Sequence, residues 1–244
     1  MMSIAPKFAL SIIIPVFNEA ESVVALYLEI KMIMEQTTYQ YEIIFIDDGS
    51  TDGTEIRLQA LTGTEQQLKI ISHKKNHGQS IALVTGVKAA RYDMLIVMDG
   101  DGQNDPADIP LLLASYDTQH TVILGNRKKR NDNKLRKLSS WIANGIRQRV
   151  LKDNCGDSGC SLKLFSREAF LALPHFNHLH RFLPALFKRA GLKIINIPVN
   201  HRPRMHGISK YGLFDRLFIG IHDLIGVHWL LKRPCAPEIY DHEQ

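Results

Sequence analysis

The sequence predicts a doubly wound α/β domain, in which a mostly parallel sheet carries helices on both faces. Short runs rich in β-branched residues, such as YEIIFID and DMLIVMD, alternate with segments of helical periodicity. The runs are almost continuously apolar, which is typical of strands that are buried on both faces. Polar residues gather after each run, and in such folds ligands bind beyond the carboxyl ends of the strands.

The elements follow one another with short connections. We expect strands at 8–16, 41–47, 68–72, 93–99 and 121–125, and helices between them at 20–35, 52–62, 78–90 and 106–119. The polar stretches after the five strands read PVFNE, DDGSTDGT, HKKNHGQS, DGDGQNDP and GNRKKR. Because parallel strands end at the same edge of a sheet, the five stretches are predicted to converge on one site.

The pattern changes after residue 131. Helical segments are predicted at 134–150, 166–173 and 178–190, and one further strand-like run, KIINIPV, follows them. No Gly/Ser-rich linker divides the chain, so we interpret it as one domain over 1–207 with an extension over 208–244.

The extension is predicted to be an amphipathic helix. Asp215, Arg216, His222 and Asp223 oppose an apolar stripe formed by Phe214, Leu217, Phe218, Ile221, Leu224 and Ile225. Two interpretations stay open at this point. The helix packs on the domain, or it lies in a membrane interface with the help of Trp229, Lys232 and Arg233.

Composition narrows the class of protein. The 244 residues carry a formal net charge of +5, which suits an anionic ligand or membrane surface and falls short of a nucleic-acid-binding tail. Three cysteines without a CxxC pair favour a reducing cytosol over a disulfide framework. We expect no signal peptide, and no apolar run reaches the roughly eighteen residues of a membrane span.

The segment MLIVMDGDGQNDP carries the strongest chemical signal. Asp99 and Asp101 stand two residues apart at a strand end, where both carboxylates can face one divalent cation such as Mg²⁺ or Mn²⁺. The glycines beside them permit a tight turn, and Gln103 offers a neutral oxygen. The alternative is a polar turn without metal, in which Asp105 caps the helix that begins at Pro106.

Spacing excludes several other motifs. An EF-hand that starts at Asp99 needs glutamate at its twelfth position, which is Pro110. A GxGxxG fingerprint needs glycine where Asp105 stands, and no GxxxxGK[ST] loop occurs. A haloacid-dehalogenase-like phosphatase carries its DxD on the first strand, with threonine or valine two residues after the second aspartate. Here the DxD follows the fourth strand, and Gln103 stands two residues after the second aspartate.

A second acidic cluster follows the second strand. Asp52 is expected to cap the next helix, while Asp47 and Asp48 face the ligand crevice. A carboxylate at such a strand end suits the imide N–H of uracil or a ribose hydroxyl. Together with PVFNE, the cluster predicts a nucleoside pocket beside the metal.

These segments together resemble a known family. SIIIPVFNEAES, IIFIDDGSTDGT, NHGQSIALVTGVKAA, LIVMDGDGQNDP, ILGNRKKR, DSGCSLKLF and RMHGISKYG look like glycosyltransferase family 2 over about residues 8–212. The likeness is to the branch of dolichyl-phosphate mannose synthases and bacterial polyprenyl-phosphate glycosyltransferases. It implies a GT-A fold, a UDP- or GDP-type sugar donor, a divalent metal (Mg or Mn), a polyprenyl-phosphate acceptor and inversion at the anomeric carbon.

The resemblance also assigns residues. The base is implied to lie against Pro15, Phe17, Glu19 and Asp47, with Asp48 near the ribose, and the metal on Asp99, Asp101 and Gln103. The implied contacts to the acceptor phosphate are Arg127, Arg204, Ser209 and Lys210. Asp157 in DSGCSLKLF matches an aspartate of the family and is taken as a residue that lines or positions the site, with Arg204 and Lys210 on the acceptor side.

The predicted activity therefore makes a polyprenyl-phosphate sugar. The expected place is the cytoplasmic face of a membrane, reached through the terminal helix, the basic surface or a separate membrane subunit, with no nucleic-acid partner. A relative that glycosylates a sugar hydroxyl, and a nucleotide-sugar-binding subunit without activity, remain the alternatives. The histidines of HFNHLH lack a cysteine or carboxylate in the segment that would complete a zinc set, and they predict a loop near the acceptor.

Overall fold

The structure is a computed structural model that describes residues 8–63, 65–117, 120–128, 145, 147–203 and 213–233, with side chains from 220 onward in the last segment. The strands are β1 (Ala9–Val16), β2 (Gln40–Asp47), β3 (Leu68–Ser72), β4 (Met94–Val97), β5 (Thr121–Arg127), β6 (Lys163–Ser166) and β7 (Lys193–Val199). The helices are α1 (Val23–Glu35), α2 (Thr54–Thr62), α3 (Gln79–Ala89), α4 (Ile109–Ala114), α6 (Arg167–Leu171), α7 (Leu183–Arg189) and α8 (Leu213–Leu231). Two 3₁₀ turns, η1 (Pro106–Asp108) and η2 (Leu179–Arg181), precede α4 and α7.

The strands form one sheet of seven in the order β3-β2-β1-β4-β6-β5-β7. Neighbours run parallel except at β6, which is antiparallel to both β4 and β5. The doubly wound, mostly parallel fold is thus confirmed. The sequence prediction missed β6, because a four-residue run with a lysine inside it carries too little periodicity to stand out.

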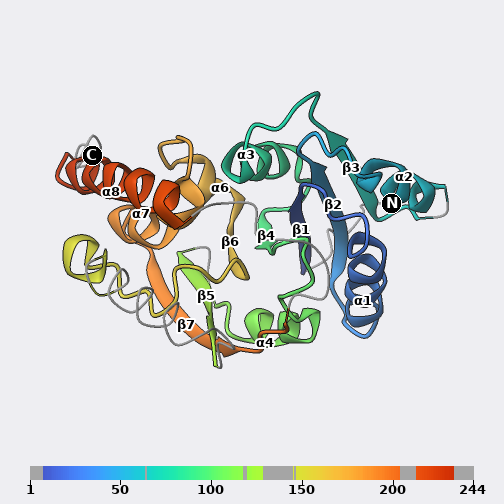
Figure 1. Ribbon diagram of the computed structural model, residues 1–244. Helices are drawn as coiled ribbons and strands as arrows, with labels where there is room; N and C mark the ends of the chain where they lie inside the picture. Colours follow the sequence, from blue (N-terminus) through green and yellow to red (C-terminus); the bar gives the residue numbers. More distant parts are fainter. Residues whose placement is uncertain are drawn as a thin grey trace, which may run out of the picture.

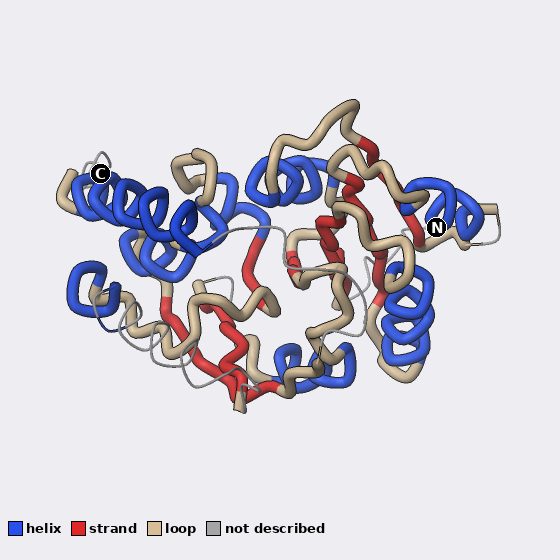
Figure 2. Tube along the Cα trace, in the orientation of Figure 1, coloured by secondary structure: helices blue, strands red, loops and turns tan. Residues whose placement is uncertain are grey.

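Two layers of helices cover the sheet (Figures 1 and 2). The α1 and α4 helices pack on one face around Ile12, Ile14 and Ile96, whereas α3, α6 and α7 pack on the other around Ile13 and Phe165. Residues of one strand alternate between the two cores, as the pleat requires. Burial on both faces explains why these strands are almost wholly apolar in sequence.

Two helix starts can be compared with the predictions, one at Asp105 and one at Asp52. The region predicted as one helix over 106–119 is a 3₁₀ turn followed by α4, and Asp105 caps it by accepting the Ala107 N–H at 3.0 Å, as expected. The expected N-cap role of Asp52 is wrong. Gly53 occupies the N-cap of α2 with φ of 91°, and the Asp52 carboxylate instead accepts the N–H groups of Thr54 and Ala20.

The terminal helix α8 lies against α7, and it is apolar on two sides rather than along one stripe. Val227 is buried in the second core, and Leu224 packs against it. Ile225 and Trp229, in contrast, are 64 % and 59 % exposed. The predicted stripe that joined Leu224 with Ile221 and Ile225 therefore divides between the core and the surface, since Ile221 is 47 % exposed. In the described segments, no helix is both long and apolar enough to cross a bilayer.

Candidate active site

The site lies at the carboxyl edge of the sheet, where β1 is flanked by β2 and β4. The register pairs Val16 with Asp47 and Ile13 with Val97, so the chains that leave these three strands emerge side by side. The chain order reverses around β1, which is the position where open α/β sheets place their ligands. Three of the predicted polar loops therefore meet here, as the sequence implied.

Hydrogen bonds tie the loops that follow β1 and β2. Asn18, in a left-handed conformation with φ of 55°, donates its N–H to Ser50 Oγ at 2.8 Å and accepts the Thr51 N–H on Oδ1 at 2.7 Å. The Glu19 N–H is donated to Thr54 Oγ1 at 2.9 Å. These contacts hold PVFNE and DDGST as one rigid rim, which includes the predicted base-binding residues.

The third loop is joined to the same rim. Ser22 Oγ donates to the Gly100 carbonyl at 2.8 Å, which connects the start of α1 to the DGD turn. A Cβ at Gly100 would overlap Val16 Cγ1, so only glycine lets the turn lie this close to β1. The two aspartates predicted to bind the metal are therefore placed by the end of β1 as well as by their own strand.

Asp99 and Asp101 project from this turn with different partners. Asp99 Oδ1 accepts from Gln79 Nε2 of α3 at 2.7 Å, and Asp101 Oδ1 accepts the N–H of Gln103 at 3.0 Å. The backbone N–H of Asp99 is fixed by Asn104 Oδ1 at 3.1 Å. Asn104 is 4 % exposed and also accepts from Ser161 Oγ at 2.6 Å, so the turn rests on a buried amide.

The electrostatics favour a cation at this point. Burial and then the Asp101 charge raise the pKa of Asp99 from 3.8 to about 6, despite the opposing influence of Ser161, Lys163 and Arg127. A raised pKa means that the ionised carboxylate lacks compensation in this protein. A divalent cation would supply that compensation, so the donor set fits a hard metal such as Mg²⁺ or Mn²⁺.

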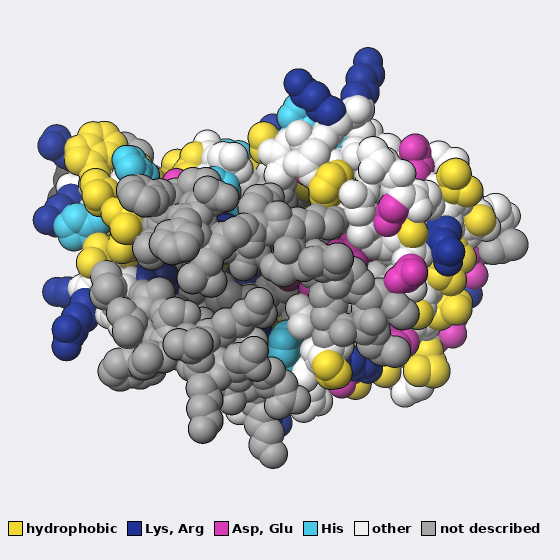
Figure 3. Space-filling view, in the orientation of Figure 1, with side chains coloured by type: hydrophobic (Ala, Val, Ile, Leu, Met, Phe, Trp, Pro, Cys, Tyr) yellow, Lys and Arg dark blue, Asp and Glu magenta, His cyan; other side chains and the backbone are white. Residues whose placement is uncertain are grey.

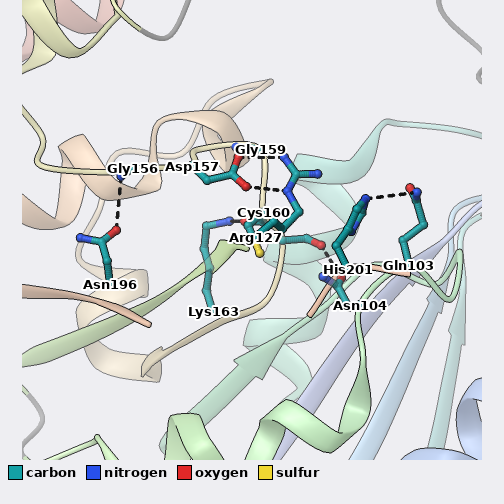
Figure 4. Close-up of polar contacts among 11 residues, drawn as sticks. Gln103, Asn104, Arg127, Gly156, Asp157, Gly159, Cys160, Lys163, Asn196 and His201 are labelled. Carbon is teal, nitrogen blue, oxygen red and sulfur yellow. Dashed lines mark hydrogen bonds and ion pairs between the residues drawn. The ribbon is translucent and has the colours of Figure 1, made fainter. Parts of the chain in front are cut away.

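The protein alone does not complete a metal cage. Among the described residues, no three His, Cys, Asp or Glu side chains converge on one point. Gln103, the third predicted ligand, lies in the same turn, and its Nε2 is 3.4 Å from His201 Nε2 (Figure 4). A cation held by one or two carboxylates takes its other ligands from water and substrate phosphates, which is usual for Mg²⁺.

Asp48 has a different environment from its neighbour Asp47. Its carboxylate is 3 % exposed and lies 2.7 Å from His73 Nδ1, while it accepts the N–H groups of His77 at 3.0 Å and Gly78 at 2.7 Å. Asp48 thereby holds the loop after β3 against the site. Asp47, 1 % exposed, accepts the Ser50 N–H at 2.9 Å. Their contacts to a base or ribose stay predictions.

Arg127 and Asp157 form a bidentate ion pair, which the sequence did not predict. Arg127 Nε and Nη2 lie 2.5 and 2.8 Å from the two Asp157 oxygens (Figure 4). The side chains are 11 % and 8 % exposed. The pair joins the end of β5 to the DSGC segment, and Gly159 leaves room for the guanidinium, because a Cβ there would lie 2.9 Å from Nη2.

A cavity of about 210 Å³ opens beside Asp99. Polar side chains that line it come from four separate segments, namely Gln79, Asp99, Lys163 and Arg181 with His180. Lys163, His180 and Arg181 were not among the predicted site residues. Lys163 stands in DSGCSLKLF and His180 ends HFNHLH, but their approach to Asp99 was not predictable, because the antiparallel strand β6 and the turn η2 reach the site only through the fold.

His180 lines the cavity as a neutral side chain. Its Nδ1 lies 2.8 Å from Ser80 Oγ on α3, and its backbone N–H is donated to the same oxygen at 3.3 Å. Burial, with the charges of Arg181 and Lys163, lowers the pKa of His180 to about 3. The HFNHLH segment is therefore placed at the site, while His178 Nδ1 lies 2.9 Å from Asp223 Oδ2 of α8.

Three predicted acceptor residues lie outside the described residues. They are Arg204, Ser209 and Lys210. The described chain approaches them at Arg202, which pairs with Glu29 at 2.6 Å and Asp105 at 2.7 Å. Phe17 and Glu19 lie, partly exposed, on the rim after β1, and Pro15 lines the cavity.

Comparison with known proteins agrees with this geometry. The family model described as glycosyl transferase family 2 matches residues 11–173. Dodecaprenyl-phosphate galacturonate synthase of Rhizobium johnstonii is 36% identical over 235 residues, which cover 93% of this chain and 69% of that protein.

Solved structures share the fold at low identity. Glucosyl-3-phosphoglycerate synthase from Mycobacterium tuberculosis with Mn²⁺ and UDP-glucose has a TM-score of 0.69 at 21% identity, over 95% of this chain and 81% of that one. The same enzyme with Mg²⁺ and UDP gives 0.67 at 19%, with the same coverage. At these identities the likeness bears on the fold alone, and the expected GT-A architecture is confirmed. By its family match, its relative and its fold, this chain belongs to glycosyl transferase family 2.

Proposed function

We propose that this glycosyltransferase moves a sugar from a UDP-type donor to a polyprenyl phosphate with the help of a divalent cation. The observation that carries the proposal is the DGD turn, which places Asp99 in the lining of a cavity where β1 and β4 end. The Rhizobium relative, whose name gives a polyprenyl-phosphate product, supports the acceptor class. Galacturonate is the sugar of that relative, so a uronate donor is the first to test.

The donor nucleotide is proposed to lie on the joined rim of the first two loops. Pro15, Phe17 and Glu19 stand at the end of β1 and Asp47 ends the neighbouring strand β2, and a carboxylate there suits the imide N–H of uracil. Asp48 acts indirectly, because its oxygens already hold the loop over 73–78. Rigid loops reduce the ordering cost of binding.

The diphosphate is proposed to meet the cation on Asp99 and Asp101, with Gln103 beside it. When bound, the cation neutralises charge that develops on the departing nucleoside diphosphate. The residues of the chain fix the two carboxylates through Gln79 and the buried Asn104. Partial burial makes an uncompensated charge on Asp99 costly, which strengthens its attraction for a positive charge.

The acceptor side needs no strong base. A phosphate monoester has its second pKa near ~6, so the attacking oxygen is already anionic at neutral pH. Asp157 is accordingly a positioning residue rather than a base, because both of its oxygens are bound to Arg127. Arg127, together with Arg204, Ser209 and Lys210 from the segment outside the described residues, is proposed to bind the acceptor phosphate.

The enzyme is proposed to act at the cytoplasmic face of a membrane, where a polyprenyl phosphate resides. The exposed face of α8 presents Ile221, Ile225 and Trp229, and Arg233 stacks 5.4 Å from the Trp229 ring. In Figure 3 hydrophobic side chains bordered by Lys and Arg lie at the end of the molecule that Figure 1 assigns to α8. Such a face suits the interface of an anionic membrane.

Vesicle sedimentation tests the membrane contact. The double variant Ile225→Glu/Trp229→Glu should lose binding to vesicles that contain anionic lipid, since two exposed apolar side chains become charged. Ile56→Glu is the matched control, because Ile56 is 73 % exposed on α2, at the other end of the molecule (Figure 1). Equal sedimentation of all three proteins would exclude α8 as the contact and assign lipid binding to another surface, whereas no sedimentation of the natural protein would favour a separate membrane subunit.

The activity is tested with labelled nucleotide sugars and two acceptor classes. We expect transfer to polyprenyl phosphate in the presence of Mn²⁺ or Mg²⁺, and loss of transfer when the cation is chelated. Transfer only to sugar hydroxyls would replace the proposed acceptor. Binding of UDP without turnover on any acceptor would favour a nucleotide-sugar-binding subunit.

A further inference from the structure

Lys163 is a buried cation that the proposed chemistry does not use. It begins β6, opposite Val97 of β4, and it is 4 % exposed. Its Nζ donates to the Cys160 carbonyl (Figure 4), and no carboxylate of the described residues lies within 4.0 Å of it. An ammonium group has three N–H donors, so further acceptors are needed to compensate the loss of water.

The cavity gives Lys163 a direction in which to find an acceptor. Lys163, Cys160, Asp99 and Arg181 all line it. The histidine there, His180, is held neutral against Ser80. In the proposed complex Asp99 binds the cation, which leaves the Lys163 ammonium beside the space that the substrate fills.

The dimensions indicate which part of the substrate enters. The cavity volume of about 210 Å³ is below the range of roughly 300–1,000 Å³ typical of pockets for drug-sized ligands. It therefore suits a single sugar ring rather than a lipid. Because Asp99 lies at its wall, a ring attached to a diphosphate at the DGD turn would extend toward Lys163.

We propose that Lys163 binds the carboxylate of an acidic sugar, so that the donor is a nucleotide-linked hexuronate rather than a neutral hexose. This inference rests on the proposed function and adds the class of sugar. Lysine acts as a compact point charge, which suits a carboxylate on a ring, while Arg181 is placed to assist from η2.

The test compares three variants with the natural protein. Lys163→Met keeps the length of the side chain and removes its charge, and Lys163→Arg keeps the charge. Lys193→Met is the matched control, because Lys193 lies exposed on β7. Binding of UDP, UDP-glucuronate, UDP-galacturonate, UDP-glucose and UDP-galactose is measured by calorimetry with Mn²⁺, and transfer rates are measured with polyprenyl phosphate. Melting temperatures confirm that each variant is folded.

We expect the natural protein to bind a UDP-uronate about 10- to 100-fold more tightly than its neutral counterpart, the range for a hydrogen bond to a charged group. Lys163→Met should abolish this preference by weakening the uronate donors far more than UDP and the neutral donors, and Lys163→Arg should retain part of it. Equal weakening of all donors would overturn the inference. So would an increase confined to the KM for polyprenyl phosphate, which would assign Lys163 to the acceptor phosphate.

The same data separate this inference from the proposed function. If UDP and neutral UDP-sugars bind and react but uronates gain nothing, the role of Lys163 is wrong and the proposed function stands. If no UDP compound binds in the presence of Mn²⁺, both are wrong. A folded Lys163→Met protein is expected, because apolar replacements of buried charges are often well tolerated.

Discussion

Replacing Asp99 by asparagine should stabilise the metal-free protein while it removes the response to metal. The carboxylate is held between Gln79 and the charge of Asp101, in a position that raises its pKa from 3.8 to about 6. A raised pKa means that ionisation of Asp99 costs folding free energy above pH 6. Asparagine keeps an oxygen for the Gln79 amide and carries no charge.

The magnitude follows from the shift. Two pKa units correspond to about 3 kcal/mol at pH 7.5, at 1.36 kcal/mol for each unit. The effect is destabilising because the folded protein disfavours the ionised form of Asp99. It is fully present above pH 6 and declines as the pH falls toward 3.8. At pH 5 the gain from Asp99→Asn should shrink to about half. For a chain of this size, 1 kcal/mol changes Tm by about 2–4 °C, so a rise of roughly 6–12 °C is expected at pH 7.5.

The assay is thermal unfolding of chelator-treated protein at pH 7.5 and pH 5, with and without Mn²⁺ and UDP. Added ligand should raise the Tm of the natural protein, because binding to the folded state stabilises it, and should leave the variant unchanged. Asp117→Asn serves as the control for sign. The Thr121 hydroxyl lowers the pKa of Asp117, so loss of that charge should not stabilise the protein.

Two results would refute the reasoning. A metal-free Asp99→Asn protein that melts lower than the natural one would mean that the carboxylate is compensated by groups of the protein. A variant that still gains stability from Mn²⁺ with UDP would place the cation elsewhere.

Three further predictions concern neighbouring contacts. Gly100→Ala should lower the Mn²⁺-dependent affinity for UDP about tenfold, since overpacking costs about 1–3 kcal/mol. Adding Val16→Ala should restore that affinity in calorimetry, because it removes the overlapping methyl group. Asp157→Asn should lower the free energy of unfolding in urea by about 3 kcal/mol, because Arg127 loses its ion-pair partner. The double variant with Arg127→Gln should recover most of that loss, and additive losses would argue against a coupled pair. Because the pKa of His180 is about 3, unfolded chains bind a proton below pH 6.5 that the folded protein does not. The natural protein should then lose about 2 kcal/mol relative to His180→Gln between pH 7.5 and pH 5, and parallel pH curves would contradict this.

Much of the donor side could be predicted from local sequence. Asp99 and Asp101 follow a buried apolar run, and the parallel arrangement brings that strand end beside those of β1 and β2. The position of the DGD turn at the site was therefore predictable. The contacts that determine how each aspartate acts were not, because Asp48 turned out to hold a loop and Asp99 to face a cavity.

The cavity beside Asp99 shows where sequence reasoning ends. Lys163 stands in DSGCSLKLF and His180 in HFNHLH, but only an antiparallel strand and a 3₁₀ turn bring them to Asp99. Likewise, Arg127 was predicted as a phosphate contact, and its partner Asp157 became visible only in three dimensions.

Most of the buried strands, the order of elements and the family were predictable from the sequence, since hydrophobic periodicity and motif spacing are local properties of the chain. The fold was needed to show which charges meet, which carboxylates are already bound and, among the described residues, that no carboxylate pairs with Lys163. Those outcomes depend on burial and on contacts between residues far apart in sequence, and burial governs both the pKa of Asp99 and the need of Lys163 for a partner.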